Sequence, residues 1–159
     1  MHEPASRVGL GFDVHPWASV DRPLLLGGLH FEGERGLEGH SDGDVVCHAL
    51  ADAMLGAAAL GDVGQHFPES DPGLEGIEGS TILTRTLALL RAEGVMFRSC
   101  DVTVMCERPV IAPRRDEMRG RLATVLGAPI GSVSVKATRP EGLGLAGDGV
   151  GCMAVVLIS

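Results

Sequence analysis

Short apolar segments recur along the chain, and their spacing separates strands from helices. Residues Arg7 to Asp13 alternate loosely between apolar and polar positions, which predicts a β-strand. Two apolar runs, 24–26 and 29–31, flank Gly27-Gly28 and predict a β-hairpin. Further strands are predicted at 97–107, 133–137 and 150–158.

The first helix is predicted in an alanine-rich stretch. Ser41-Asp42 can cap a helix that we expect to run to about Leu60, where Gly61 ends it. Residues 61–79 hold glycines, prolines and acidic side chains, which indicates a loop. A loop of this length in a compact domain is usually functional or mobile.

Two more helices complete the expected set. Ser80 is expected to cap a helix to about Glu93, and Pro113 to begin another that ends near Leu126. The length suits one domain, 1–159. We expect an α+β fold, in which a mixed β-sheet has helices packed on one face. The other face also needs a cover, and self-association is the simplest one.

Composition narrows the classes of partner. The net charge of −8 argues against nucleic acid, whose binding requires a basic surface. Residues 1–7 lack the apolar stretch of a signal peptide, and no apolar run approaches the roughly 18 residues of a membrane span. The four cysteines form no C-x-x-C pair and are expected to be reduced core residues. We therefore expect a cytoplasmic protein without a membrane partner.

The first candidate for chemistry is Asp13-Val14-His15, at the end of the first predicted strand. Residues two apart in a strand point to the same side, so this carboxylate and imidazole can share one metal ion. The alternative is a turn-forming aspartate beside a surface histidine.

The second candidate is the segment 40–44 followed by His48. Asp44, His48 and Asp52 recur every four residues and would lie on one helical face among apolar neighbours. An imidazole between two carboxylates is typical of a supported metal ligand, whereas the alternative is the solvated face of an amphipathic helix. Together with Asp13 and His15, His48 would offer zinc two nitrogens and one oxygen, leaving a fourth position open.

The third candidate is the segment 136–144, where a strand ends and a glycine-containing turn begins. Thr138 and Arg139 can face phosphate oxygens, and Glu141 can hold a hard cation such as Mg²⁺. An ordinary charged turn is the alternative. An acidic protein that handles a phosphorylated substrate needs such cations to supply positive charge.

These segments resemble the 2-C-methyl-D-erythritol 2,4-cyclodiphosphate synthase family. The resemblance rests on five segments, which occur in the family's order and spread over nearly the whole chain: 11–15, 40–44, 56–64, 67–68 and 135–138. It implies a metal-dependent phosphorus–oxygen lyase of non-mevalonate isoprenoid biosynthesis. The implied reaction cyclises 4-diphosphocytidyl-2-C-methyl-D-erythritol 2-phosphate and releases CMP. It also implies a homotrimer with active sites between neighbouring subunits.

The resemblance further implies two metal ions. Asp13, His15 and His48 would hold one Zn²⁺ per subunit. Glu141 would hold a Mg²⁺ or Mn²⁺ ion that bridges the substrate diphosphate.

Roles in substrate binding also follow from the resemblance. His40 and Ser41 would contact phosphates, residues 106–112 would meet the cytidine, and Thr138 would reach the diphosphate from the adjoining subunit. The residues implied as catalytic are His40, Thr138 and Glu141. Those implied in substrate binding are Asp13, His15, His40, Ser41, Asp62, Gly64, Cys106, Pro109, Ala112, Thr138, Arg139 and Glu141.

Several positions depart from the family's pattern. Members of the family usually have threonines at the positions of Arg139 and Pro140, and a lysine at the position of Val110. Near the trimer axis, Leu145 and Asp148 replace an aromatic residue and an arginine. In some members of the family a cavity on this axis holds an isoprenoid diphosphate. Since carboxylates repel a diphosphate, we expect this protein to retain no prenyl diphosphate there.

Two other functions are compatible with the same residues. A zinc phosphohydrolase acting on a nucleotide would use the same ligands to deliver a metal-bound water. A trimeric metal-binding or nucleotide-sensing module would bind without turnover. The products formed from the full substrate distinguish all three.

Overall fold

The computed structural model describes residues 5–144 and 148–159. A four-stranded mixed sheet has the strand order β1-β6-β4-β5, and β2 and β3 form a separate hairpin. β1 and β4 are antiparallel to β6, whereas β5 is parallel to β4, so β1, β4 and β5 end at one edge of the sheet. The strands are β1 (Arg7–Pro16), β2 (Leu24–Leu26), β3 (Leu29–Phe31), β4 (Phe97–Met105), β5 (Val133–Thr138) and β6 (Gly149–Ile158).

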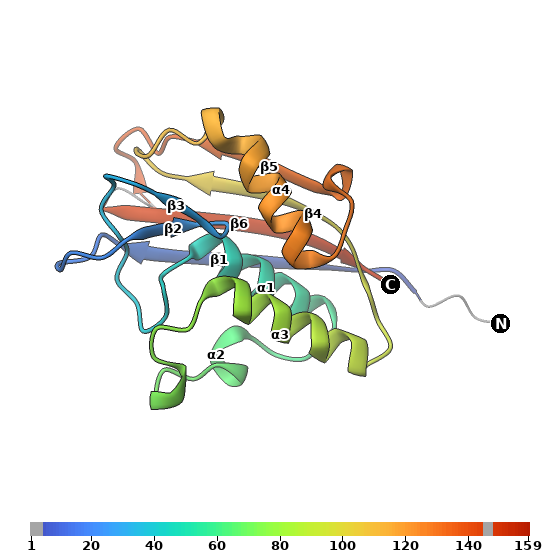
Figure 1. The fold of residues 1–159 in the computed structure, drawn as a ribbon. Helices are drawn as coiled ribbons and strands as arrows, with labels where there is room; N and C mark the ends of the chain where they lie inside the picture. The colour runs from blue at the N-terminus through green and yellow to red at the C-terminus, as the bar shows by residue number, and fades with distance from the viewer. Residues whose placement is uncertain (1–4, 145–147) are drawn as a thin grey trace.

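The helices lie on one face of this sheet (Figure 1). They are α1 (Val45–Ala57), α3 (Gly79–Ala92) and α4 (Arg115–Leu126), with the single-turn α2 (Val63–His66) beside them. Three 3₁₀ turns lie at Pro72–Leu74, Ala112–Arg114 and Ile130–Ser132. The predicted α+β class, with a mixed sheet and helices on one face, is confirmed. No helix among the described residues is long and apolar enough to cross a membrane.

Strand β1 turns its smallest residues toward the helices. A Cβ atom on Gly11 would lie 1.8 Å from the carbonyl oxygen of Ala49, and one on Gly9 would lie 1.9 Å from that of Ala53. Because glycine has no Cβ, the α1 backbone approaches the strand directly. This close packing brings the first turn of α1 over the carboxyl end of β1.

The first helix begins later than predicted. Its N-cap is Asp44, whose carboxylate accepts hydrogen bonds from the backbone N–H groups of Val46 and Cys47. Asp42 instead accepts from the backbone of Asp44 and Gly79, so it fixes the preceding loop. The helix ends at Ala57, because Ala59 adopts a left-handed backbone conformation.

Smaller differences occur at the other helix ends. Ser80 does not cap α3, which begins at Gly79 after the N-cap Glu78. A 3₁₀ turn containing Pro113 precedes α4, which ends at Leu126 as predicted, with Gly127 behind it in a left-handed conformation.

The opposite face of the sheet carries exposed apolar side chains. On β1, Val8 and Leu10 are each 67% exposed. The other exposed apolar residues on β1 and β6 are Phe12, Val14, Met153 and Val155. A patch of this kind usually marks an interaction surface.

Candidate metal and substrate site

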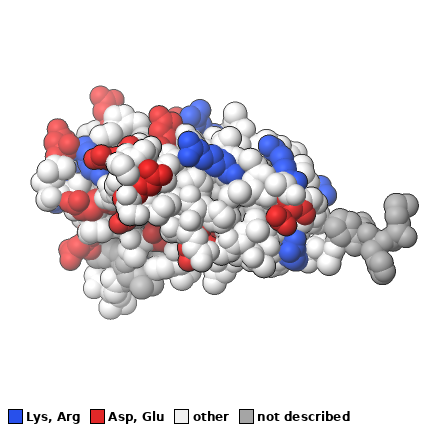
Figure 2. All heavy atoms as spheres, turned by 90° about the horizontal axis from the view of Figure 1, so that it is seen from below, with Lys and Arg blue, Asp and Glu red and all other residues white. Residues whose placement is uncertain are grey.

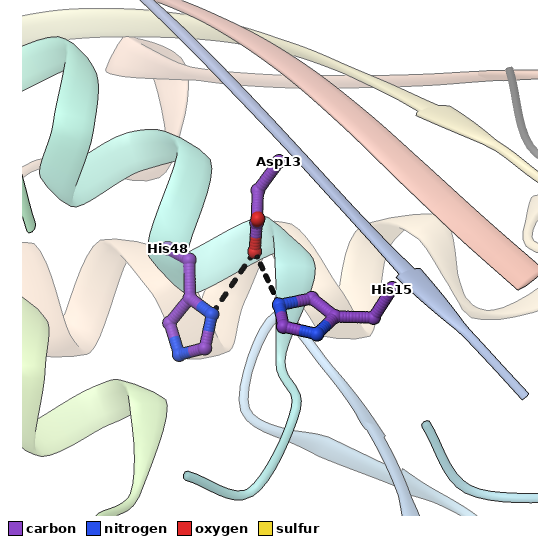
Figure 3. Close-up of side chains that lie close together, drawn as sticks. All are labelled: Asp13, His15 and His48. Atoms are coloured by element: carbon purple, nitrogen blue, oxygen red, sulfur yellow. Dashed lines mark hydrogen bonds and ion pairs between the residues drawn. The ribbon is translucent and has the colours of Figure 1, made fainter. Parts of the chain in front are cut away.

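Asp13, His15 and His48 meet between the end of β1 and the first turn of α1 (Figure 3). Asp13 Oδ2 lies 2.9 Å from His15 Nε2 and 3.0 Å from His48 Nδ1. One potential ligand atom from each residue lies within 4.8 Å of the others, so the cluster could hold a metal ion. The geometry predicted from the sequence for these three residues is therefore present.

Burial and pairing shape the electrostatics of this cluster. The side chains of Asp13, His15 and His48 are 26%, 19% and 10% exposed. Burial alone would raise the pKa of Asp13, but hydrogen bonds from both imidazoles outweigh it and lower the pKa to about 2. Burial alone would lower the pKa of His15, but its hydrogen bond to the Asp13 carboxylate and the negative charges around it together raise the pKa. Asp13 is thus held as an anion, the form that binds a cation.

Ser41 fixes the orientation of His48. Its Oγ lies 3.2 Å from His48 Nε2 and accepts a hydrogen bond from the backbone N–H of Gly43. With Nε2 donating to this oxygen, Nδ1 would carry no proton and would offer its lone pair to a metal ion in place of the hydrogen bond to Asp13. A hydrogen bond of this kind sets the ring orientation of metal-ligating histidines.

The predicted support of His48 by two neighbouring carboxylates is wrong. Asp44 is fully buried, and its carboxylate accepts hydrogen bonds from the backbone N–H groups of Gly27 and Gly28 as well as from its own helix. Asp52 accepts from the N–H of Val63. Asp44 therefore joins the hairpin to α1, and Asp52 joins α2 to α1.

A cavity of about 240 Å³ opens beside the cluster. Asp13, His15 and His48 line it together with the predicted residues His40, Ser41 and Gly64. Asp52 and Glu69 also line it, although neither was predicted to bind the substrate. The apolar part of the wall is formed by Val63, Phe67, Leu74, Ile77 and Ile82.

A second cavity, of about 170 Å³, lies where β4 and β5 end. It collects five predicted substrate residues: Cys106, Pro109, Ala112, Thr138 and Arg139. Arg115 also lines it and was not predicted. The Cys106 Sγ donates to the carbonyl of Pro109 at 3.4 Å, which fixes the turn that forms one wall.

The two cavities lie at one edge of the sheet but on different strands. In the ladder, Asp13 on β1 pairs with Cys152, which pairs with Val104, which pairs with Ala137 on β5. Three strand spacings of about 4.8 Å put Asp13 roughly 14 Å from Ala137. The structure therefore gathers ten of the twelve predicted substrate-binding residues into two groups within one chain.

Glu141 and Asp62 lie outside both sets of cavity-lining residues. Glu141 is exposed on a turn, which Gly142 ties to Glu107 through a 3.1 Å hydrogen bond. Asp62 is the N-cap of α2 and accepts from the N–H of Gln65. Leu145 lies outside the described residues, and Asp148 is exposed.

Charge is distributed unevenly over the surface. Figure 2 shows most of the visible acidic side chains at the end toward which β1 runs, and more basic side chains over the middle and opposite end. The cluster of Asp13, His15 and His48 lies near this acidic end. Such a field favours the approach of cations and disfavours an anion that arrives without them.

Comparisons with known proteins agree on one family. The model of the YgbB family matches residues 6–159. A 2-C-methyl-D-erythritol 2,4-cyclodiphosphate synthase of Idiomarina loihiensis is 47% identical over 96% of this chain and 96% of its own length. The enzyme of the same name from Symbiobacterium thermophilum is 48% identical over 96% of this chain and 98% of its own.

A solved structure of an enzyme with this name also resembles the fold of this chain. A structure of a 2C-methyl-D-erythritol-2,4-cyclodiphosphate synthase, in a bound form with CDP, matches with a TM-score of 0.89. It is 34% identical in sequence, and the match covers 96% of this chain and 100% of that one.

Proposed function

This chain belongs to the YgbB family, and on that premise we propose that it is a 2-C-methyl-D-erythritol 2,4-cyclodiphosphate synthase. The proposed substrate is 4-diphosphocytidyl-2-C-methyl-D-erythritol 2-phosphate, and the products are the cyclic diphosphate and CMP. The observation that carries the proposal is the cluster of Asp13, His15 and His48 on a cavity wall, in a chain this similar to named synthases.

The donor set of the cluster fits zinc. One carboxylate oxygen and two imidazole nitrogens are ligands that catalytic zinc sites use, and such sites leave a position open for substrate. We propose one Zn²⁺ per subunit on these residues. A bound zinc would supply Lewis acidity toward a phosphate oxygen.

The chemical step needs no nucleophile from the protein. An oxygen of the substrate's 2-phosphate attacks the β-phosphorus, and the bond from that phosphorus to the oxygen retained by CMP breaks. The residues must therefore fold the substrate so that its two ends meet in line. Positioning of this kind supplies up to about 7–11 kcal/mol in favourable cases.

We assign the residues of the two cavities to different parts of the substrate. His40 and Ser41 would donate hydrogen bonds to phosphate oxygens in the cavity beside the zinc ligands. Gly64 lines the same cavity, where it and the adjacent Asp62 would hold the methylerythritol hydroxyls. The cavity with Cys106, Pro109, Ala112, Thr138 and Arg139 would take the cytidine and its diphosphate. The apolar wall of the first cavity would limit hydrolysis by excluding water.

We further propose a homotrimer with shared active sites. Two observations support it: the apolar sheet face on β1 and β6, and the separation of the two cavities by intervening strands. A neighbouring subunit can cover the face and bring one chain's second cavity to another chain's zinc ligands. Thr138 would then reach the diphosphate from the adjoining subunit.

Glu141 is the proposed ligand of a second divalent ion. It is exposed and lies on a turn held by Gly142, so its carboxylate can extend toward a substrate that bridges subunits. Mg²⁺ or Mn²⁺ suits a carboxylate and diphosphate oxygens.

We also place the protein in the cytoplasm, because its four buried cysteines are all free thiols.

Phosphorus NMR of the reaction tests the function. Purified protein with Zn²⁺, Mg²⁺ and the full substrate is expected to yield the coupled signals of a cyclic diphosphate together with CMP. A linear phosphate product would instead support the zinc phosphohydrolase. Binding without turnover would support the metal-binding or sensing module. Omission of Mg²⁺, and separately of substrate, provides the controls.

A further inference from the structure

We propose that Arg22 is a positioning residue. It holds the segment 39–41 against the cavity and thereby fixes the positions of the Ser41 and His40 side chains. The kinetic part of this inference rests on the proposed function, and the spectroscopic part rests on the geometry and the proposed zinc site without requiring turnover. Arg22 lies outside the set of residues that line the cavity beside Asp13, and it lines a separate surface hollow. Its hydrogen bonds to the segment 39–41 connect it to the site.

The Arg22 guanidinium bridges two backbone carbonyls that are two residues apart. Nη1 donates to Gly39 O at 2.9 Å, and Nη2 donates to Ser41 O at 2.5 Å. The carbonyl of His40, between them, accepts instead from the N–H of Gly76 at 2.7 Å. The segment is thus held from two sides, by a side chain and by the loop that follows the Pro72–Leu74 turn.

The held segment touches the zinc ligands at two points. Ser41 Oγ lies 3.2 Å from His48 Nε2. A Cβ atom on Gly39 would lie 3.4 Å from His15 Nδ1, so this glycine lies against the ring. Between them, His40 lines the cavity, with its Nε2 3.3 Å from the carbonyl of Asp71. A shift of the segment would therefore move a substrate-facing histidine and the partner of a metal ligand together.

The fork of arginine suits this task better than lysine. A guanidinium presents N–H groups in a rigid plane and can reach two acceptors at once, whereas an ammonium is a point charge on a flexible stem. The chain also makes room for Arg22: a Cβ on Gly36 would lie 2.6 Å from Arg22 Cγ and 2.4 Å from its carbonyl oxygen. Gly36 lets the backbone pass directly over the arginine.

Arg35 provides a matched control. It lines the same surface hollow, and its Nε also donates to a backbone carbonyl, that of Ala18. It makes no hydrogen bond to the segment 39–41 among the described contacts. A general effect of losing an arginine from this hollow would appear equally in both variants.

The kinetic test compares Arg22→Ala, Arg22→Lys and Arg35→Ala. We expect kcat of Arg22→Ala to fall about 10- to 100-fold, the range seen when partners of metal ligands are lost. We expect Arg22→Lys to recover little, and Arg35→Ala to keep its activity. Added guanidinium, at millimolar concentration, should restore part of the activity of Arg22→Ala, and methylammonium should not. Unchanged kcat in Arg22→Ala, or equal rescue by both cations, would overturn the proposal.

A spectroscopic test needs no substrate. In zinc-loaded protein with ¹⁵N-labelled histidine, the His48 Nε2–H signal should be sharp and slow to exchange with water, because Ser41 accepts its proton. In Arg22→Ala and in Arg22→Lys this signal should broaden or exchange at least several-fold faster, while Arg35→Ala leaves it unchanged. A signal unaltered in folded Arg22→Lys would refute the positioning role. If the wild-type protein forms no cyclic product, only the proposed function fails, and this test still decides the role of Arg22.

Discussion

The two faces of β1 carry opposite kinds of residue. The inner face has Gly9 and Gly11 against α1, followed by Asp13 and His15 at the site. The outer face has large apolar side chains, with Leu10 67% exposed. In most sheets that pack against helices on one side, the apolar residues face inward. Here the inner positions are small because a helix backbone lies directly on them.

This difference separates two tasks within one strand. Since neighbouring residues of a strand point to opposite sides, the inner face can form the metal site while the outer face forms an assembly surface. All three proposed zinc ligands come from one chain, so zinc binding and assembly should respond to different substitutions.

The largest effect is expected from Gly11→Ala on the inner face. The new methyl group would lie 1.8 Å from the carbonyl oxygen of Ala49, so α1 must move away from β1. Overpacking typically costs 1–3 kcal/mol, and a contact with backbone on both sides should reach about 3 kcal/mol or more. Urea unfolding measures the loss. Gly56→Ala, in α1 with open space around it, should change stability by less than about 1 kcal/mol. Equal stability of the two variants would contradict the packing argument.

His48→Ala should remove the metal and spare the fold. His48 is one of three ligands, so we expect most bound zinc to be lost and turnover to fall roughly 100-fold or more. Elemental analysis beside circular dichroism checks both expectations. His30→Ala, at an exposed position on β3, should keep its zinc. Full zinc occupancy in His48→Ala would refute the ligand assignment.

On the outer face, Leu10→Asp should break assembly and leave zinc binding intact. A charge at the centre of an apolar interface loses its hydration when the subunits meet. We expect light scattering to give a mass near that of a monomer, with zinc still bound and turnover lost because the site is shared. Ile130→Asp, at an exposed apolar position away from this face, should remain trimeric. A wild-type protein that is monomeric and fully active would contradict the shared site.

The smallest effect is expected from Glu141→Gln. The amide cannot supply the negative charge that a hard cation prefers, so the Mg²⁺ concentration for half-maximal turnover should rise several-fold. Zinc content should stay the same, because Glu141 is not part of the cluster around Asp13. Glu107→Gln is a less suitable control, since Glu107 holds the same turn. An unaltered Mg²⁺ dependence would show that Glu141 is only a turn residue.

The sequence predicted the site better than it predicted what supports the site. The period of a strand suffices to place Asp13 and His15 on one side, and the alanine-rich helix carries His48. The partners of these residues depend on contacts between distant segments. Asp44 has the spacing of a neighbour of His48, yet its carboxylate is taken by the N–H groups of the Gly27-Gly28 turn.

Contacts between segments that are distant in the sequence explain the other features that the sequence did not predict. Arg22 is 17 residues from Gly39, and nothing in the local pattern marks it as a partner of that segment. The glycines of β1 weakened the alternation that identifies a strand, although they are what lets α1 approach. The division of the substrate residues between two cavities follows from the strand order β1-β6-β4-β5, which periodicity does not determine.

X-ray absorption at the zinc edge tests most directly whether the inner face of β1 and His48 form the metal site. The two imidazoles and the Asp13 carboxylate predict a first shell of nitrogen and oxygen only, at about 2.0–2.1 Å, with the multiple scattering of two histidines. Cys47 precedes His48 in the chain and is buried, so a wrongly assigned site could recruit its thiolate. A sulfur scatterer at about 2.3 Å would contradict the account.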